Sequence, residues 1–206
     1  MIGNLIIVSA PSGTGKTTLV NEVIKSDQHV KRSISFTSRM PRAGEIDGVH
    51  YHFVTRERFH LMAERGEFLE WAQVHGNFYG TSLRGVDELR NAQFDVILTI
   101  DVQGARSARS MFPEAISIFL LPPSYQSLVE RLDARGTDAS DDLKVRLDNA
   151  LGELAHFQSF DYLVINDDLT RAADEVAAII IAERCRRVRR AAVAEKILQT
   201  FNSLWE

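Results

Sequence analysis

A run of eight residues near the N-terminus has the residue types and spacing of a phosphate-binding loop. The run is Ala10, Pro11, Ser12, Gly13, Thr14, Gly15, Lys16 and Thr17. Its glycines allow backbone angles at which successive N–H groups point toward one centre, and its lysine supplies a positive charge for the β- and γ-phosphates of a nucleotide. A threonine hydroxyl is an oxygen ligand of the kind that Mg²⁺ prefers. The run therefore predicts an ATP site made by all eight residues, with Mg²⁺ as cofactor and Thr17 as its protein ligand.

The first position of this loop departs from the strict pattern, because Ala10 stands where glycine is usual. A methyl group is tolerated there if the residue keeps a negative φ. The loop alone leaves the reaction open, since GTPases, motors, transporters and small-molecule kinases all use it.

A second group of residues has the chemistry of another anion site. Arg39 and Arg42 stand three residues apart among hydroxyl side chains in the stretch 33–45. Guanidinium groups match phosphate oxygens with paired hydrogen bonds. A phosphate site separate from the first loop is what an enzyme needs when the acceptor of a phosphoryl group already carries a phosphate. Such an acceptor needs no general base, because positioning and charge neutralisation can carry the transfer.

The elements that must position these residues alternate between strands and helices. Short apolar runs predict strands at 4–9, 94–100, 115–121 and 162–165. Apolar residues at helical spacing predict helices at 16–25, 104–111, 124–135, 138–157 and most of 170–204. This alternation predicts an α/β fold with a parallel, doubly wound sheet and right-handed crossovers.

Residues 33–82 have a different texture, rich in arginine, glycine, aromatic and hydroxyl side chains. Short strands are expected at 49–54 and 68–74, and a helix is expected from a Thr55 N-cap through Glu64, ended by Gly66. We expect this stretch to form a mixed α+β subdomain inserted into the α/β core.

Asp101 directly follows the predicted strand at 94–100. The carboxyl ends of parallel strands line the ligand crevice of such folds. Asp101 is therefore expected either to order the water around Mg²⁺ or to contact the acceptor.

Length and composition place the chain among single-domain globular proteins. It has 206 residues, of which 45% are hydrophobic and 25% are charged. A net charge of −4 argues against a general nucleic-acid surface, and the one cysteine, Cys185, fits a reducing compartment. Neither a signal peptide nor a membrane span is evident. We expect a cytoplasmic protein, monomeric or homo-oligomeric, with neither nucleic acid nor membrane as a partner.

Four sequence patterns carry a resemblance to a known family. They are S-x-x-x-R-x-x-R-x-G-E at 35–45, E-W-x-x-x-x-G-x-x-Y-G-T at 70–81, I-D-x-Q-G at 100–104 and R-G-T-D at 135–138. With the phosphate loop, they make the chain resemble the guanylate kinase family, P-loop kinases that transfer a phosphate from ATP to GMP. The resemblance implies one kinase domain: a core of 1–32, 83–134 and 158–206, a GMP-binding subdomain at 33–82 and a lid at 135–157.

The resemblance also implies an acceptor site for GMP, and for dGMP as well. Its implied residues are Ser35, Arg39, Arg42, Glu45, Tyr51, Glu70, Tyr79, Thr81 and Asp101. The two arginines and two tyrosines would hold the phosphate, Ser35 and Thr81 would contact the base, and Glu70 would accept hydrogen bonds from guanine N1–H and its amine. Adenine lacks that donor pair, so such a site should reject it.

The catalytic residues implied by the resemblance are mostly cations. They are Lys16, Arg39, Arg42, Arg135 and Arg146, together with Asp101. Arg135 and Arg146 would close over the phosphates from the lid, where several cations can stabilise the transferring group; Arg131 is a weaker choice for the same role. Thr99 stands where the family usually has an acidic residue, so one water-mediated contact is expected to be missing.

Two other functions remain open from the sequence. One is a kinase on the same scaffold that phosphorylates another phosphorylated metabolite, against which Glu70, Ser35 and Thr81 argue. The other is a catalytically silent interaction module that resembles the family, against which an intact Lys16 and Thr17 argue.

Overall fold

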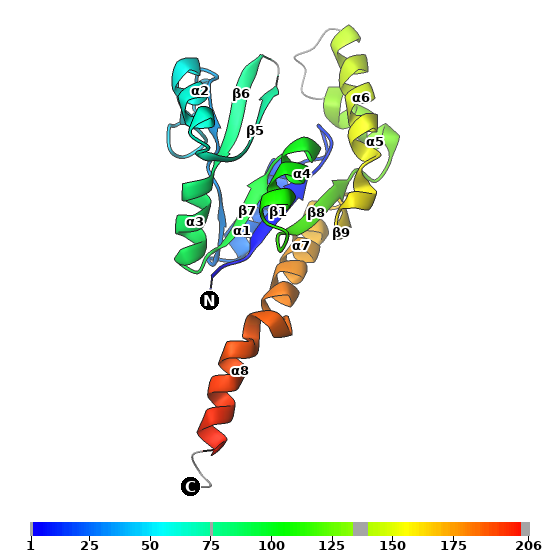
Figure 1. The fold of residues 1–206 in the computed structure, drawn as a ribbon. Coiled ribbons are helices and arrows are strands. Elements are labelled where there is room, and N and C mark those ends of the chain that lie inside the picture. The colour runs from blue at the N-terminus through cyan, green and yellow to red at the C-terminus, as the bar shows by residue number, and fades with distance from the viewer. Residues whose placement is uncertain (1, 75, 134–139, 203–206) are drawn as a thin grey trace.

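The structure is a computed structural model and describes residues 2–74, 76–133 and 140–202. Its central sheet has five parallel strands in the order β2-β7-β1-β8-β9 (Figure 1). Their bounds are β2 Val30–Arg32, β7 Asp95–Thr99, β1 Leu5–Ser9, β8 Ile116–Leu121 and β9 Tyr162–Ile165. The middle strands are almost wholly apolar because helices cover both faces of the sheet.

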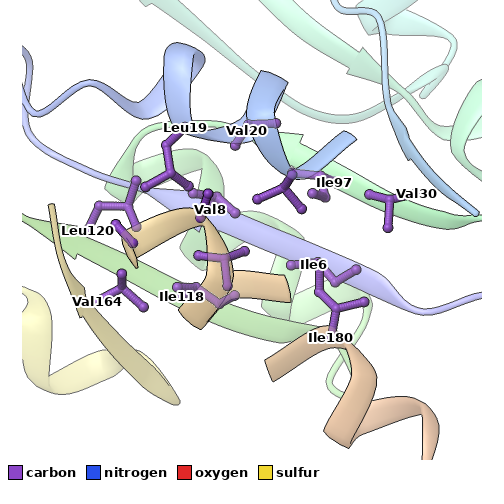
Figure 2. Close-up of a cluster of buried hydrophobic side chains, with 14 of the residues drawn as sticks. Ile6, Val8, Leu19, Val20, Val30, Ile97, Ile118, Leu120, Val164 and Ile180 are labelled. Atoms are coloured by element: carbon purple, nitrogen blue, oxygen red, sulfur yellow. The ribbon is translucent and has the colours of Figure 1, made fainter. Parts of the chain in front are cut away.

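One face of the central sheet packs on two helices, α1 (Lys16–Ser26) and α7 (Leu169–Arg184). Figure 2 shows this core, to which β1 contributes Ile6 and Val8, α1 contributes Leu19 and Val20, and α7 contributes Ile180. The other face packs on α3 (Leu83–Asn91) and α4 (Val102–Met111) through alternate strand residues such as Leu5 and Ile7. The doubly wound parallel sheet predicted from the sequence is confirmed.

A second, mixed sheet has the strand order β4-β3-β6-β5. Its bounds are β4 His52–Phe53, β3 Phe36–Thr37, β6 Asn77–Ser82 and β5 Phe68–Val74, and α2 (Arg56–Glu64) packs on it. Phe59, Met62, Phe68 and Phe78 form a small separate core between α2 and this sheet. The predicted cap is confirmed, because the Thr55 hydroxyl accepts a hydrogen bond from the Arg58 N–H at 3.2 Å.

Two helices lie across the central sheet from the mixed sheet (Figure 1): α5 (Tyr125–Asp133) and α6 (Ser140–Leu154). They pack on each other through Leu128, Leu132 and Ala150. A 3-10 turn, Phe157–Ser159, follows α6 and leads into β9.

The helix expected at 170–204 is divided into α7 and α8 (Arg187–Asn202), with exposed Cys185 at the break. Figure 1 shows α8 extending away from the rest of the molecule, and Ile197, Leu198 and Phe201 on it are exposed. Within the described ranges, no helix has both the length and the apolar character needed to cross a membrane.

Three differences from the sequence expectations concern short or polar elements. The strand expected at 49–54 is reduced to β4, because Gly48 adopts a positive φ of 74° and residues 47–51 form turns. Strands β2, β3 and β6, which are short or polar, were not predicted from the sequence. Helix α3 was also missed.

Candidate active site

The phosphate loop connects β1 to α1 and has the geometry that its glycines predict. Gly13 and Gly15 have φ values of 87° and 92°, and Gly15 is the N-cap of α1. A Cβ on Gly13 would lie 2.7 Å from Cδ2 of Leu132, so the position excludes larger residues for packing reasons as well. Ala10 is buried. Gln93 is the one non-glycine residue with a positive φ among those described, so Ala10 has a negative φ and the loop accommodates its methyl group.

Lys16 begins α1 beneath the loop, and its Nζ donates a hydrogen bond to the Ile100 carbonyl at 2.8 Å. Burial lowers the pKa of this ammonium group, while the carboxylates of Glu153, Asp101 and Glu70 act to raise it. The lysine therefore stands among three carboxylates that help to keep it charged. Thr17 is exposed in the first turn of α1.

Arg39 lies at the centre of a compact cluster on the mixed sheet. Its guanidinium donates to Glu45 Oε1 at 2.8 Å and to the Met40 carbonyl at 2.7 Å. It also faces the Tyr51 ring, with Cζ 5.6 Å from the ring centre, and the Tyr79 ring centre is 5.9 Å from that of Tyr51. The structure thus brings together three of the four residues expected to hold a phosphate.

Glu45 accepts hydrogen bonds from the Arg39 guanidinium and from the Arg42 backbone. Its Oε2 accepts a hydrogen bond from the backbone N–H of Arg42 at 2.7 Å, while Oε1 is bonded to Arg39. These contacts, with Arg39 the largest, lower the pKa of Glu45 to about 2. Both oxygens of Glu45 are thus engaged within the protein, and its expected contact with GMP stays a prediction.

Glu70 is a buried carboxylate on β5, with 8% of its surface exposed. The Thr81 hydroxyl on the paired strand β6 donates to its Oε1 at 2.6 Å. Burial is the largest cause that raises the pKa of Glu70, to about 7, and nearby Asp101 adds to it. A buried group of this kind is poised to change charge near neutral pH and is typical of a functional site.

The start of α4 leaves room for Glu70. A Cβ on Gly104 would lie 2.9 Å from Oε2 of Glu70 and 3.3 Å from Oδ1 of Asp101. That same Oδ1 accepts the Gly104 N–H at 2.7 Å and caps α4. Asp101 therefore lies where the sequence predicted, at the end of β7, with one oxygen committed to the helix.

A pocket of about 990 Å³ lies between the phosphate loop, the end of β5, the start of α4 and α6. It is bordered by Ser12 of the phosphate loop, Asp101 and Arg106 at α4, and Arg146 and Glu153 on α6. A pocket of similar size between α2 and α3 has none of the predicted site residues in its lining.

Comparison with known proteins agrees with this geometry. The guanylate kinase family model matches residues 2–183. The guanylate kinase of Dechloromonas aromatica is 48% identical over 202 residues, covering 96% of this chain and 100% of the relative, and that of Geobacter metallireducens is 45% identical, covering 97% of each. The chain belongs to the guanylate kinase family. It is therefore an enzyme of the nucleoside monophosphate kinase class.

Solved structures support the fold of this guanylate kinase family member. The crystal structure of guanylate kinase from Anaplasma phagocytophilum has a TM-score of 0.76 and 31% identity, covering 91% of this chain and 89% of that one. The SH3-kinase fragment of tight junction protein 3 has a TM-score of 0.52 at 9% identity, covering 90% of this chain and 59% of that one, and shows likeness of fold alone.

Two residues outside the phosphate loop, Asn166 and Arg131, donate hydrogen bonds to its backbone. Asn166, just after β9, donates from Nδ2 to the Thr14 carbonyl at 2.6 Å. Arg131 donates to the same carbonyl at 3.3 Å and to the Asn166 carbonyl at 2.9 Å. Arg131 thus contacts the backbone of the phosphate loop, and its expected role in the lid stays a prediction. Asn166 was not predicted from the sequence, although it is a polar residue directly after a predicted strand, as Asp101 is.

The remaining predicted residues are distributed as follows. Arg42 is exposed beside the Arg39 cluster, and Ser35 is half-buried just before β3. Arg146 is half-buried on α6 and borders the pocket, whereas Arg135 lies outside the described residues. Thr99 ends β7, two residues before Asp101.

Proposed function

We propose that this chain transfers the γ-phosphate of ATP to GMP across the pocket between the phosphate loop and the mixed sheet. As a member of the guanylate kinase family it is an ATP:GMP phosphotransferase, and the proposal concerns which residues do each part. The loop from Ala10 to Thr17 binds the triphosphate. Residues 33–82 form the GMP-binding unit, and the region 135–157 acts as a lid.

The observation that carries this assignment is the position of Glu70. Its buried carboxylate influences the pKa of Lys16, and Lys16 in turn lowers that of Glu70, so the base-reading group and the phosphate-loop lysine share one site. A carboxylate with one oxygen held by Thr81 offers two acceptors in a fixed plane. Guanine presents two adjacent N–H donors to such a group, and adenine does not.

The acceptor phosphate is assigned to Arg39, Arg42, Tyr51 and Tyr79, with Ser35 and Thr81 beside the base. None of these roles involves the ribose 2′-hydroxyl, so dGMP is an acceptor too. Arg146 and Arg135 supply lid cations for the transferring phosphate, and Asp101 contacts the acceptor or the metal's water shell.

The residues around Lys16 suit Mg²⁺. The Thr17 hydroxyl in the first turn of α1 and the Asp101 carboxylate at the end of β7 are hard oxygen ligands, which this ion prefers. Thr17 would bind the ion directly and Asp101 would hold its water. Bound Mg²⁺ neutralises charge on the β- and γ-phosphates.

Replacement of Glu45 by glutamine tests the supporting role given to that residue. The variant loses the charged partner of Arg39, so we expect KM for GMP to rise about tenfold with a smaller change in kcat, because a neutral amide no longer makes the charge-assisted hydrogen bond that orients Arg39. Steady-state kinetics with varied GMP measures both constants. Glu64→Gln on α2 is the control, and an unchanged KM in Glu45→Gln would refute the assignment.

A turnover panel tests the proposed function. With ATP and Mg²⁺, the chain should phosphorylate GMP and dGMP and should turn over AMP and UMP at least about 10³-fold less efficiently. Sugar phosphates belong in the same panel. Equal or better use of an acceptor without guanine would show that Glu70 does not read the base.

A further inference from the structure

Glu153 lies in the last turn of α6, facing the phosphate loop. The Ser12 N–H and the Lys16 ammonium group both favour its ionised form, while burial raises its pKa. Its Oε2 is shielded from solvent and has no hydrogen-bond partner among the described residues. A buried carboxylate oxygen without a hydrogen-bond partner costs free energy, so the position of Glu153 is an unfavourable one.

The groups that face Glu153 are those that phosphate would use. Lys16 and the loop N–H groups form an anion site. Among the carboxylates near Lys16, Glu153 has the largest influence on its pKa. A triphosphate entering the loop would bring further negative charge beside Glu153. Like charges repel strongly in a partly buried site.

Arg146 stands on the same side of α6 as Glu153. Seven residues separate them, which is nearly two helical turns, or about 10.5 Å along the axis. Both side chains border the pocket that contains Ser12. One face of a single helix therefore carries the carboxylate that now lies at the loop and the arginine that the reaction needs there.

We propose that Glu153 is a positioning residue that occupies the anion site of the phosphate loop when no nucleotide is bound, and that the triphosphate of ATP displaces it. Its departure moves the end of α6 and allows Arg146 to approach the phosphates. This inference rests on the proposed function, because it assumes that ATP binds at the loop.

Other charged groups surround Glu153 and share its electrostatics. Lys16 faces it from α1, Asp101 and Arg106 from the start of α4, and Arg146 and Asp148 from α6, with His156 just beyond. Asp148 is an exposed carboxylate on α6 that borders the same pocket, so it offers a matched comparison.

Calorimetric titration of ATP and Mg²⁺ into GMP-free protein at pH 8 tests this inference. Glu153→Gln removes the competing charge with little change in shape, so ATP should bind about tenfold more tightly, which corresponds to about 1.4 kcal/mol. Asp148→Asn should stay within about twofold of wild type. An affinity equal to or weaker than wild type in Glu153→Gln would overturn the proposal.

Two further measurements keep the test decisive. The ratio of the ATP affinities of Glu153→Gln and wild type should narrow as the pH is lowered, because burial raises the pKa of Glu153 and its protonation removes the competing charge from the wild type as well; a constant ratio would contradict the proposal. Glu153→Asp, which withdraws the charge by one methylene group, should bind ATP more tightly than wild type, and no gain would contradict it. Wild-type GMP turnover is measured in parallel, since its absence would refute the proposed function rather than this inference.

Discussion

Replacement of Lys16 by alanine should lower kcat/KM for GMP phosphorylation by about 10³-fold or more. The Nζ of this lysine lies beneath the glycine turns of the loop, bonded to the Ile100 carbonyl, where it can follow the γ-phosphate during transfer. Loss of a preorganised charge in a site shielded from water removes stabilisation that solvent cannot replace. Steady-state kinetics with ATP, Mg²⁺ and GMP measures the effect.

The chain offers a matched control for this variant on the same helix. Lys25 in the last turn of α1 is exposed and forms an ion pair with Glu22 at 2.7 Å. Lys25→Ala should leave the kinetic constants unchanged within about twofold, because exposed pairs contribute little. Near-normal turnover by a folded Lys16→Ala variant would refute the catalytic role of the loop.

Replacement of Glu70 by glutamine should cost about 10²- to 10⁴-fold in kcat/KM for GMP. The amide keeps the shape of the side chain and can still bond to Thr81. It also places an N–H donor against the donors of guanine, so one polar group on each side loses its partner. Kinetics with GMP as the varied substrate measures the loss, and Glu67→Gln, at a half-buried position just before β5, is the control. Unaltered use of GMP would show that the base is read elsewhere.

The same variant should raise the stability of the fold at pH 8. The pKa of Glu70 is about 7 in the fold, against 4.5 for an ordinary glutamate, so the folded state binds the proton more tightly than the unfolded state. Stability therefore falls as the pH rises from about 4.5 to 7, and the full penalty remains above pH 7. Removing the charge should recover about 1–3 kcal/mol in denaturant unfolding at pH 8 and much less at pH 4.

The titration of Glu70 also has a consequence for substrate binding. Only the ionised carboxylate can accept both N–H groups of guanine. In the free enzyme, protonation as the pH falls below about 7 should therefore raise KM for GMP. Glu70→Gln should not show this pH dependence, so that comparison separates the effect of Glu70 from the titration of the GMP phosphate.

The parts of the site that the sequence predicted are those whose residues stand close together along the chain. The spacing of Gly13, Gly15 and Lys16 fixes a loop with one geometry, and the structure has it. Arg39 and Glu45 likewise meet within a single short stretch. Local patterns of this kind carry their own structural meaning.

The parts that the sequence did not reveal come together through the fold. Asn166 and Thr14 are 152 residues apart in the sequence, and they meet because the pairing of β8 with β9 places Asn166, which follows β9, beside the loop. Glu153 approaches the same loop from α6, and helical periodicity alone gives it no more than a surface role. Helix α3 was a different kind of omission, since Val86 and its partly buried neighbours Leu83 and Leu89 are spaced as an amphipathic helix requires.

The most direct test of a two-site transfer across one pocket is the binding of a dinucleotide in which five phosphates join guanosine to adenosine. One molecule should bind per chain, at least about 10²-fold more tightly than ATP or GMP alone, because linking two occupied sites raises the effective concentration of the second. Calorimetry gives both the stoichiometry and the affinity. Two molecules per chain, or an affinity no better than that of ATP, would show that the two nucleotides do not bind at adjoining sites of one pocket.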